Sequence, residues 1–206
     1  RVKIVWKTGQ EIAENSVIGC LFSNELVDAF PGHKVAIDAG ELKEIYLSLS
    51  DRDELITQII DEISTPRIKK YFQLVEINLP SEIYENGYQT EVNLASLAWL
   101  ENISKRLYKG YIVTIDYGYD ARRYYQPQRR EGTLQCYYQH RHHNNPYINI
   151  GSQDITCHVD FTALENGGKL FGLEKVGFTQ QGMFLMSLGL GDRLQELSSG
   201  KLNFLE

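Results

Sequence analysis

Cysteine is scarce in this sequence, and the few cysteines are not spaced as metal ligands or disulfide partners. There are three, Cys20, Cys136 and Cys157, and none belongs to a CxxC pair. Their odd number and wide spacing argue against a zinc knuckle and against a disulfide framework. They indicate a reducing compartment, which we expect to be the cytoplasm.

Long apolar runs and an excess of positive charge are also lacking. No apolar run approaches the roughly 20 residues of a membrane span, and no signal peptide is visible at the N-terminus. The formal net charge is −6, so the surface as a whole is not built to bind phosphate backbones. We therefore expect neither a membrane span nor a nucleic-acid partner.

The composition and the pattern of apolar residues predict one globular α/β domain over residues 1–206. It is 42% hydrophobic and 23% charged, which is ordinary for a chain with a single core. Short apolar runs predict strands, and apolar residues at helical spacing predict helices. The predicted strands cover residues 2–6, 16–22, parts of 35–49, 111–115 and 170–176. The predicted helices cover residues 53–64, 66–72, 92–107, 161–164 and 180–188.

The clearest local signal surrounds the predicted strand at residues 111–115. A helix over residues 92–107 is followed by Gly110, by a β-branched run and by a polar loop that begins at Asp116. This order is typical of a parallel α/β unit. Residues 120–145, in contrast, are polar, basic and aromatic, and we expect them to form a long loop.

Three acidic motifs follow predicted strands or lie near them. They read SNELVDAFP at residues 23–31, TIDYGY at residues 114–119 and DITCHVDF at residues 154–161. Ligands of open parallel sheets bind at the carboxyl ends of the strands. If the motifs converge on one sheet edge, they predict a site for a cationic group.

Each acidic residue also has a purely structural interpretation. Glu25 would oppose the dipole in the first turn of a short helix, with Asn24 or Ser23 as its N-cap. Asp116 would be a turn residue, while Asp154 and Asp160 would cap a turn or a helix. It is the combination of the three motifs that favours a functional site.

The motifs together resemble the MidA-type methyltransferases, whose mitochondrial member is a complex I assembly factor that methylates an arginine. The matching text, in the family's order, is SNELVDAFP, DYGY, REGTLQCYYQH, DITCHVDF and TQQGMFLMSLG. The resemblance implies a class I, Rossmann-like methyltransferase fold with a mostly parallel sheet and a helical insertion over about residues 50–91. It also implies S-adenosyl-L-methionine as cofactor, and it places the family's glycine-rich cofactor loop before residue 1.

The reaction and the resemblance together assign roles to these residues. A guanidinium pairs bidentately with carboxylate, so we expect Glu25 to orient a substrate arginine, with Asp28 as the candidate second carboxylate. His158 or Asp160 would receive the proton, although for His158 the pattern favours a buried, hydrogen-bonded histidine without a catalytic role. The cofactor would contact Asn24 and Asp116. The substrate, a protein of the complex I subunit type, would contact Tyr117, Arg130, His140, Asp154 and Thr156.

Two other functions fit parts of the sequence. His158 and Asp160 match the H-x-D half of an iron site, but no histidine follows them, and His140, His142 and His143 lie upstream in the expected loop, so we predict no metal. Arginines and tyrosines also alternate through residues 120–145. That pattern is typical of a non-catalytic binding or assembly module, here on a methyltransferase-like scaffold.

Overall fold

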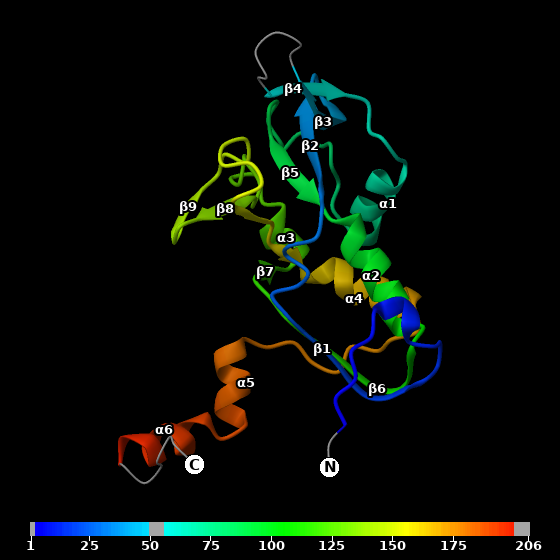
Figure 1. Cartoon of the computed structure of the whole chain (residues 1–206). Coiled ribbons are helices and arrows are strands. Elements are labelled where there is room, and N and C mark those ends of the chain that lie inside the picture. Colours follow the sequence, from blue (N-terminus) through cyan, green and yellow to red (C-terminus); the bar gives the residue numbers. More distant parts are fainter. Residues whose placement is uncertain (1–2, 50–55, 200–206) are drawn as a thin grey trace. The chain divides into compact units, whose positions relative to one another are not determined.

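The computed structural model describes residues 3–49 and 56–199 (Figure 1). The chain divides into two compact units, residues 1–174 and residues 175–206, which are described separately. The second unit contains α5 (Gln181–Ser187) and α6 (Leu190–Ser198), and α5 confirms the helix expected over residues 180–188. No helix among the described residues is long and apolar enough to cross a membrane.

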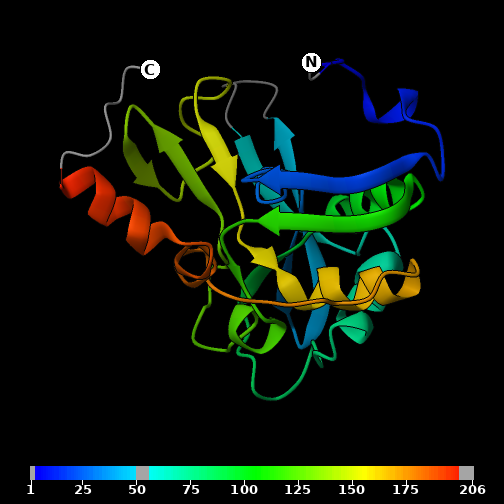
Figure 2. The same ribbon diagram turned by 90° about the horizontal axis from the view of Figure 1, so that it is seen from below.

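Two parallel strands of the first unit carry the ends that form the candidate site. β1 (Val17–Asn24) pairs with β6 (Leu107–Ile115), and Figure 2 shows the two arrows side by side and pointing the same way. Both strand predictions are confirmed, but Gly110 lies inside β6 and does not end a helix. Gly110 faces Gly19 of β1, where an added Cβ would come within 1.8 Å of the Gly19 carbonyl oxygen. Close approach of the two strands therefore explains this glycine.

A separate antiparallel sheet has the strand order β4-β3-β2-β5. β2 (His33–Asp38) and β3 (Glu41–Leu49) form the expected hairpin, with Ala39 and Gly40 in the turn at positive φ. β5 (Gln89–Val92) pairs with the other edge of β2 (Figure 1). This sheet supplies much of the buried core.

The helix predicted over residues 53–64 is wrong where the structure describes it, from residue 56 onward. β4 (Ile56–Asp61) is a strand that pairs with β3, while residues 53–55 lie outside the described residues. Isoleucine and threonine fit a pleated surface well, and pairing with β3 outweighs the helical spacing of the isoleucines. The segment over residues 50–91 is consequently not purely helical, because it also holds β4 and β5.

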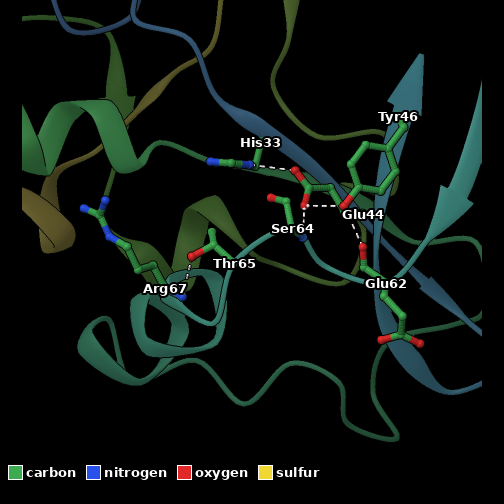
Figure 3. Close-up of polar contacts among 7 residues, drawn as sticks. All are labelled: His33, Glu44, Tyr46, Glu62, Ser64, Thr65 and Arg67. Atoms are coloured by element: carbon green, nitrogen blue, oxygen red, sulfur yellow. Dashed lines mark hydrogen bonds and ion pairs between the residues drawn. The ribbon is translucent and has the colours of Figure 1, made fainter. Parts of the chain in front are cut away.

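A buried glutamate joins this sheet to the helix that follows it. Glu44, on β3, accepts a hydrogen bond from the backbone NH of Ser64 at 2.6 Å and lies 2.6 Å from Nδ1 of His33 (Figure 3). The helix α1 (Arg67–Leu74) begins just beyond, where the hydroxyl of Thr65 accepts from the backbone NH of Arg67 at 3.3 Å. The Thr65-Pro66 pair predicts a cap at Thr65 and a first helical residue at Pro66, but the structure places Pro66 at the N-cap, without a side-chain cap, and the helix starts at Arg67.

Three helices close the core of the first unit. α2 (Leu94–Ser104) and α4 (Phe161–Leu170) pack on each other and on α1. The Asn93 side chain caps α2 by accepting from the backbone NH of Ser96 at 2.8 Å. α2 is shorter than the predicted helix over residues 92–107, because its last predicted residue belongs to β6. Aromatic side chains fill the core, and the rings of Phe72 and Tyr125 meet edge to face at 5.4 Å.

Residues 120–145 are more ordered than a long loop. They contain α3 (Ala121–Tyr124), β8 (Gln135–Tyr138) and β9 (Arg141–His143), and β8 is the middle strand of a sheet that β10 (Asp154–Thr156) completes. β7 (Gly118–Tyr119) pairs in parallel with β11 (Val159–Asp160). Composition predicted the polarity of this region but not these short pairings, which depend on partners distant in sequence.

Two predicted strands are absent. Residues 3–8 have no regular structure and lead into a short 3-10 turn at Gly9–Glu11. At residues 170–176, α4 instead runs to Leu170, well beyond the predicted end at residue 164, and residues 173–180 have no regular structure. Gly172, at φ +82°, follows the helix, and the backbone NH of Leu173 bonds back to the carbonyl of Gly168 at 2.9 Å. These are features of a helix terminus, not of a strand.

Candidate active site

The loops that follow β1 and β6 are held together by Asp116. Its Oδ2 accepts hydrogen bonds from the backbone NH groups of Val27 at 2.9 Å and Asp28 at 3.4 Å. Its Oδ1 accepts from the backbone NH of Tyr117 at 2.9 Å. Asp116 is therefore the turn residue that the structural interpretation predicted, and it also fixes the loop that carries Glu25.

Glu25 lies at the end of β1 with an exposed side chain. Its backbone NH donates to the carbonyl of Ile115 at 2.9 Å, and its φ is +46°. A positive φ is uncommon for a residue other than glycine and is found at sites where the surroundings impose it. The first turn of a helix, the structural interpretation of Glu25, is not present. Its carboxylate makes no hydrogen bond or ion pair with any residue that the structure describes.

Asp28 completes what we call the acidic edge, the three carboxylates of Glu25, Asp28 and Asp116. Its side chain is buried, and burial raises its pKa, assisted by the negative charges of Asp116 and Glu25. The charges of Glu25 and Asp116 act on Asp28, so the three carboxylates lie close enough together to act on one bound cation. The first two acidic motifs therefore meet as the sequence predicted.

Part of the third motif joins the acidic edge. The backbone NH of Cys157 donates to the carbonyl of Asp28 at 2.9 Å, which places the next residue, His158, beside the edge. The His158 ring stacks on Tyr119 with ring centroids 5.1 Å apart, and its backbone NH donates to the hydroxyl of Thr133 at 3.1 Å. Burial lowers the pKa of His158, so its ring is neutral near pH 7 and can accept a proton.

Asp160 has a different environment. Its Oδ1 accepts from the backbone NH groups of Thr162 and Ala163, which makes it the N-cap of α4. Its Oδ2 accepts from the hydroxyl of Tyr71 at 3.2 Å, and burial raises its pKa to about 6. Both carboxylate oxygens are thus engaged, so the hydrogen bonds support the helix-cap interpretation over proton transfer.

The remaining predicted residues are dispersed. Tyr117 is exposed next to Asp116, whereas Asp154 and Thr156 lie on β10, paired with β8. His140 is exposed in the turn between β8 and β9, at φ +63°. Arg130 forms an exposed ion pair with Glu85 at 2.7 Å. Asp154 therefore caps neither a turn nor a helix, and the third motif does not converge as a whole.

The two residues expected to contact the cofactor differ in what they can offer. Asn24 is exposed at the carboxyl end of β1, with its side chain able to donate and accept hydrogen bonds. Both oxygens of Asp116 already accept from backbone amides, so its role is to shape the edge. The carboxyl ends of parallel strands are where α/β folds bind nucleotide-like ligands, so Asn24 fits one wall of such a site.

Sequence reasoning missed a buried polar network next to His158. Glu91, on β5, accepts from the backbone NH of Thr133 at 2.8 Å and from its hydroxyl at 3.1 Å. The Thr133 hydroxyl also lies 2.9 Å from that of Tyr124 and receives the NH of His158. Burial raises the pKa of Glu91. The REGTLQC text contained Thr133, but nothing local linked it to a glutamate 42 residues away.

A cavity of about 1000 Å³ opens over this network. Tyr119, Thr133 and His158 line it, so it adjoins the acidic edge through His158. Its cationic lining residues are Lys34, Arg129 and Arg130, and the imidazoles of His142 and His143 also line it. The guanidinium of Arg129 lies 4.4 Å from the Tyr119 ring centroid, which orders both side chains.

Comparison with known proteins gives a consistent result for this architecture. Residues 1–179 match a family described as "Putative S-adenosyl-L-methionine-dependent methyltransferase". Over 185 residues, the chain is 25% identical to the Drosophila melanogaster protein arginine methyltransferase NDUFAF7 homolog, mitochondrial, covering 86% of this chain and 38% of that protein.

Two solved structures from Burkholderia thailandensis share the fold. One, a COG1565 superfamily member bound to S-adenosyl-homocysteine, is 30% identical with a TM-score of 0.81 over 95% of this chain and 49% of that chain. The other, an uncharacterized protein of the same superfamily, is 32% identical with a TM-score of 0.79 over 89% of this chain and 47% of that chain. The mixed α/β fold is therefore shared with a methyltransferase-like protein, and this chain spans less than half of each relative.

Proposed function

This chain belongs to the S-adenosyl-L-methionine-dependent methyltransferase family that its residues 1–179 match, and we propose that it methylates an arginine of a partner protein within a Rossmann-like domain. The observation that carries the proposal is the acidic edge, where an exposed Glu25 stands beside the buried Asp28. The arginine methyltransferase activity in the name of the Drosophila relative supports the same substrate class. A complex I subunit as the partner stays a prediction.

Glu25 is proposed to bind the guanidinium of the substrate. A guanidinium is protonated at neutral pH and pairs bidentately with a carboxylate, so a carboxylate without another partner is the group that can orient it. Asp28 adds a second negative charge at the same edge. The cofactor would supply an electrophilic methyl group when bound, and Glu25 and Asp28 would hold the accepting nitrogen in position to receive it.

His158 is proposed to accept the proton that the guanidinium nitrogen loses. Its ring is half-buried, its pKa is lowered by burial, and it lies beside the acidic edge through the bond between Cys157 and Asp28. A general base must be unprotonated before the transfer, and its ring must be held in place. The stack on Tyr119 provides that restraint.

Two measurements test the proposal. Calorimetric titration of S-adenosyl-L-methionine into this chain, and into a form extended upstream, asks whether the protein binds the cofactor. The extended form is then incubated with labelled cofactor and a cell extract, and the labelled products are hydrolysed. We expect methylarginine. Label in lysine or histidine would contradict the arginine assignment.

A binding or assembly role is the second candidate. It is favoured by one observation, the cluster of arginines and histidines around the cavity in residues 129–143. If neither form of the protein binds the cofactor, this role replaces methyl transfer.

A further inference from the structure

We propose that the cationic cavity binds acidic side chains that flank the target arginine, so that the substrate is an arginine in an acidic segment. The proposal rests on the proposed function for the identity of the arginine. The cavity, however, is independent of the methyl-transfer chemistry and can be tested without it.

The charge of the cavity lining is the first support. Lys34, Arg129 and Arg130 carry permanent positive charge, against a single lining carboxylate at its surface, Glu131. Lys34 and Arg129 make no ion pair with any carboxylate that the structure describes. The guanidinium of Arg129 is instead fixed by the backbone carbonyls of residues 123 and 124, at 2.7 and 2.9 Å. A cation held by neutral carbonyls keeps its charge available for an anionic ligand.

Arg130 is paired with the exposed Glu85 at 2.7 Å, but the carboxylate that faces Lys34 across the sheet does not compete at the cavity surface. Glu91 lies opposite Lys34 in the pairing of β2 with β5. Its side chain is buried and accepts a hydrogen bond from the backbone NH of Thr133. Gly132 covers it, since an added Cβ there would lie 2.1 Å from Glu91 Oε1. Glu91 therefore does not compete with an anionic ligand at the cavity surface.

The position of the cavity is the second support. His158 lines the cavity, and its neighbour Cys157 bonds the backbone of Asp28 on the acidic edge. The acidic edge, which is negative, and the cavity, which is positive, thus adjoin each other through Cys157 and His158. A peptide with arginine at the acidic edge would place its flanking residues over the cavity, because each extended residue advances about 3.3 Å. Complementary charge at both places would fix the direction and register of the peptide.

A protein segment fits this cavity better than a nucleic acid. About 1000 Å³ accommodates a few side chains, and the net charge of the whole chain is −6. Such a surface repels an extended phosphate backbone beyond the local cationic patch.

The test uses fluorescein-labelled peptides with one central arginine. One peptide has flanking Asp and Glu, and its matched partner has Asn and Gln at the same positions. Fluorescence anisotropy without cofactor measures binding to the wild-type chain. We expect the acidic peptide to bind about tenfold tighter at low salt, with the preference decreasing as salt is raised.

Variants locate the binding. The double variant K34Q/R130Q, and the single variant Arg130→Gln, remove cavity charge from side chains that are not buried. We expect the preference to fall to about twofold in the double variant. The matched control is Arg122→Gln, an exposed arginine of α3 outside the cavity, which should bind like wild type.

Three outcomes would overturn the inference: equal binding of both peptides, an unchanged preference in K34Q/R130Q, or stronger binding of a single-stranded oligonucleotide than of the acidic peptide. Failure of methyl transfer with a preserved acidic preference would instead contradict the proposed function alone. Methylation of both peptides with equal efficiency and equal affinity would contradict only the inference.

Discussion

The carboxylates at the acidic edge and those in the interior of the first unit differ in how fully they are hydrogen-bonded. Glu25 leaves its carboxylate without a partner among the described residues. Glu91 and Asp160, in contrast, accept from backbone NH groups and hydroxyls in buried positions. Buried carboxylates that accept such bonds hold segments together, whereas an exposed and unpaired carboxylate can meet a ligand. Glu91 does so through Oε2 alone, because its buried Oε1 has no hydrogen-bond partner among the described residues.

Asp116 and Asp28 stand between these two extremes. Asp116 is at the acidic edge, yet it acts as an interior carboxylate does, because three backbone NH groups occupy it. Asp28 is buried, but its pKa is raised by burial and by the charges of Asp116 and Glu25. The comparison supports the roles that we propose: positioning by Asp116, substrate contact by Glu25, and a charge at the edge that depends on Asp28.

The largest expected effect is on catalysis. Glu25→Gln keeps the shape of the side chain and removes its charge, so we expect methyl transfer by the upstream-extended form to fall by about a thousandfold. Cofactor affinity and the unfolding free energy should hardly change, because the side chain is exposed. Single-turnover transfer and calorimetry measure the two effects, with the exposed Glu14→Gln as control. Normal turnover in the Glu25 variant would show that Glu25 does not bind the substrate guanidinium.

The next largest effect concerns the buried network. Gly132→Ala places a Cβ within 2.1 Å of Glu91 Oε1 at a residue with φ +81°. We expect the free energy of unfolding to fall by about 3 kcal/mol, from the clash and the backbone strain together. Urea denaturation gives the value.

Gly87→Ala is a matched control for this substitution. Gly87 has φ +84° and nothing within 4 Å of the added Cβ, so it reports the backbone strain alone. We expect a loss of about 1 kcal/mol there. Equal losses at the two glycines would mean that Glu91 can move aside, and the interior network would then be less rigid than the comparison requires.

The pH dependence of the unfolding free energy tests the buried carboxylate of Asp160. Its folded-state pKa of about 6 is above the ordinary aspartate value of 3.8, so folding favours its protonated form. The stability it contributes is complete below about pH 4 and is lost as the pH rises through 6, by about 2 to 3 kcal/mol. Asp160→Asn keeps an oxygen for the cap of α4 and should flatten this part of the stability profile.

Methyl transfer distinguishes the two roles given to Asp160. As a helix cap it should be dispensable for chemistry, so the Asn variant of the extended form should keep most of its activity at pH 7. A large loss of turnover without a loss of stability would restore the proton-acceptor role that the sequence suggested. Urea denaturation between pH 4 and pH 7 provides the stability measurement.

The elements that could be predicted from the sequence are those set by local pattern. The β-branched run of β6, the hairpin of β2 and β3 and the start of α1 after Pro66 each carry their signal within a few residues. β4 could not be predicted in this way, because its isoleucines also fit a helix and only pairing with β3 decides the conformation. The short pairings in residues 118–160 depend likewise on distant partners.

The same division holds for the site. That Glu25 and Asp116 meet follows from a general rule, since residues after neighbouring parallel strands share one sheet edge. The sequence does not predict which carboxylate is hydrogen-bonded within the protein, because Asp160 and Glu25 both look like acidic loop residues. The roles of Glu91 and Thr133 appear only when β5 lies beneath the segment at residue 133. Hydrogen-bond partners, and not residue type, separate the two classes of carboxylate.

The smallest expected effect is a change in unfolding free energy at Arg130, an exposed residue outside both the acidic edge and the interior network. Arg130 pairs with Glu85 at 2.7 Å, but their side chains are 55% and 74% exposed. Solvent screens such a pair, so Arg130→Gln should change the unfolding free energy by less than about 0.5 kcal/mol. A double-mutant cycle with Glu85→Gln measures the coupling in urea denaturation. A coupling well above 1 kcal/mol would make Arg130 part of the scaffold, and its expected effect on binding of acidic peptides could then no longer be attributed to charge alone.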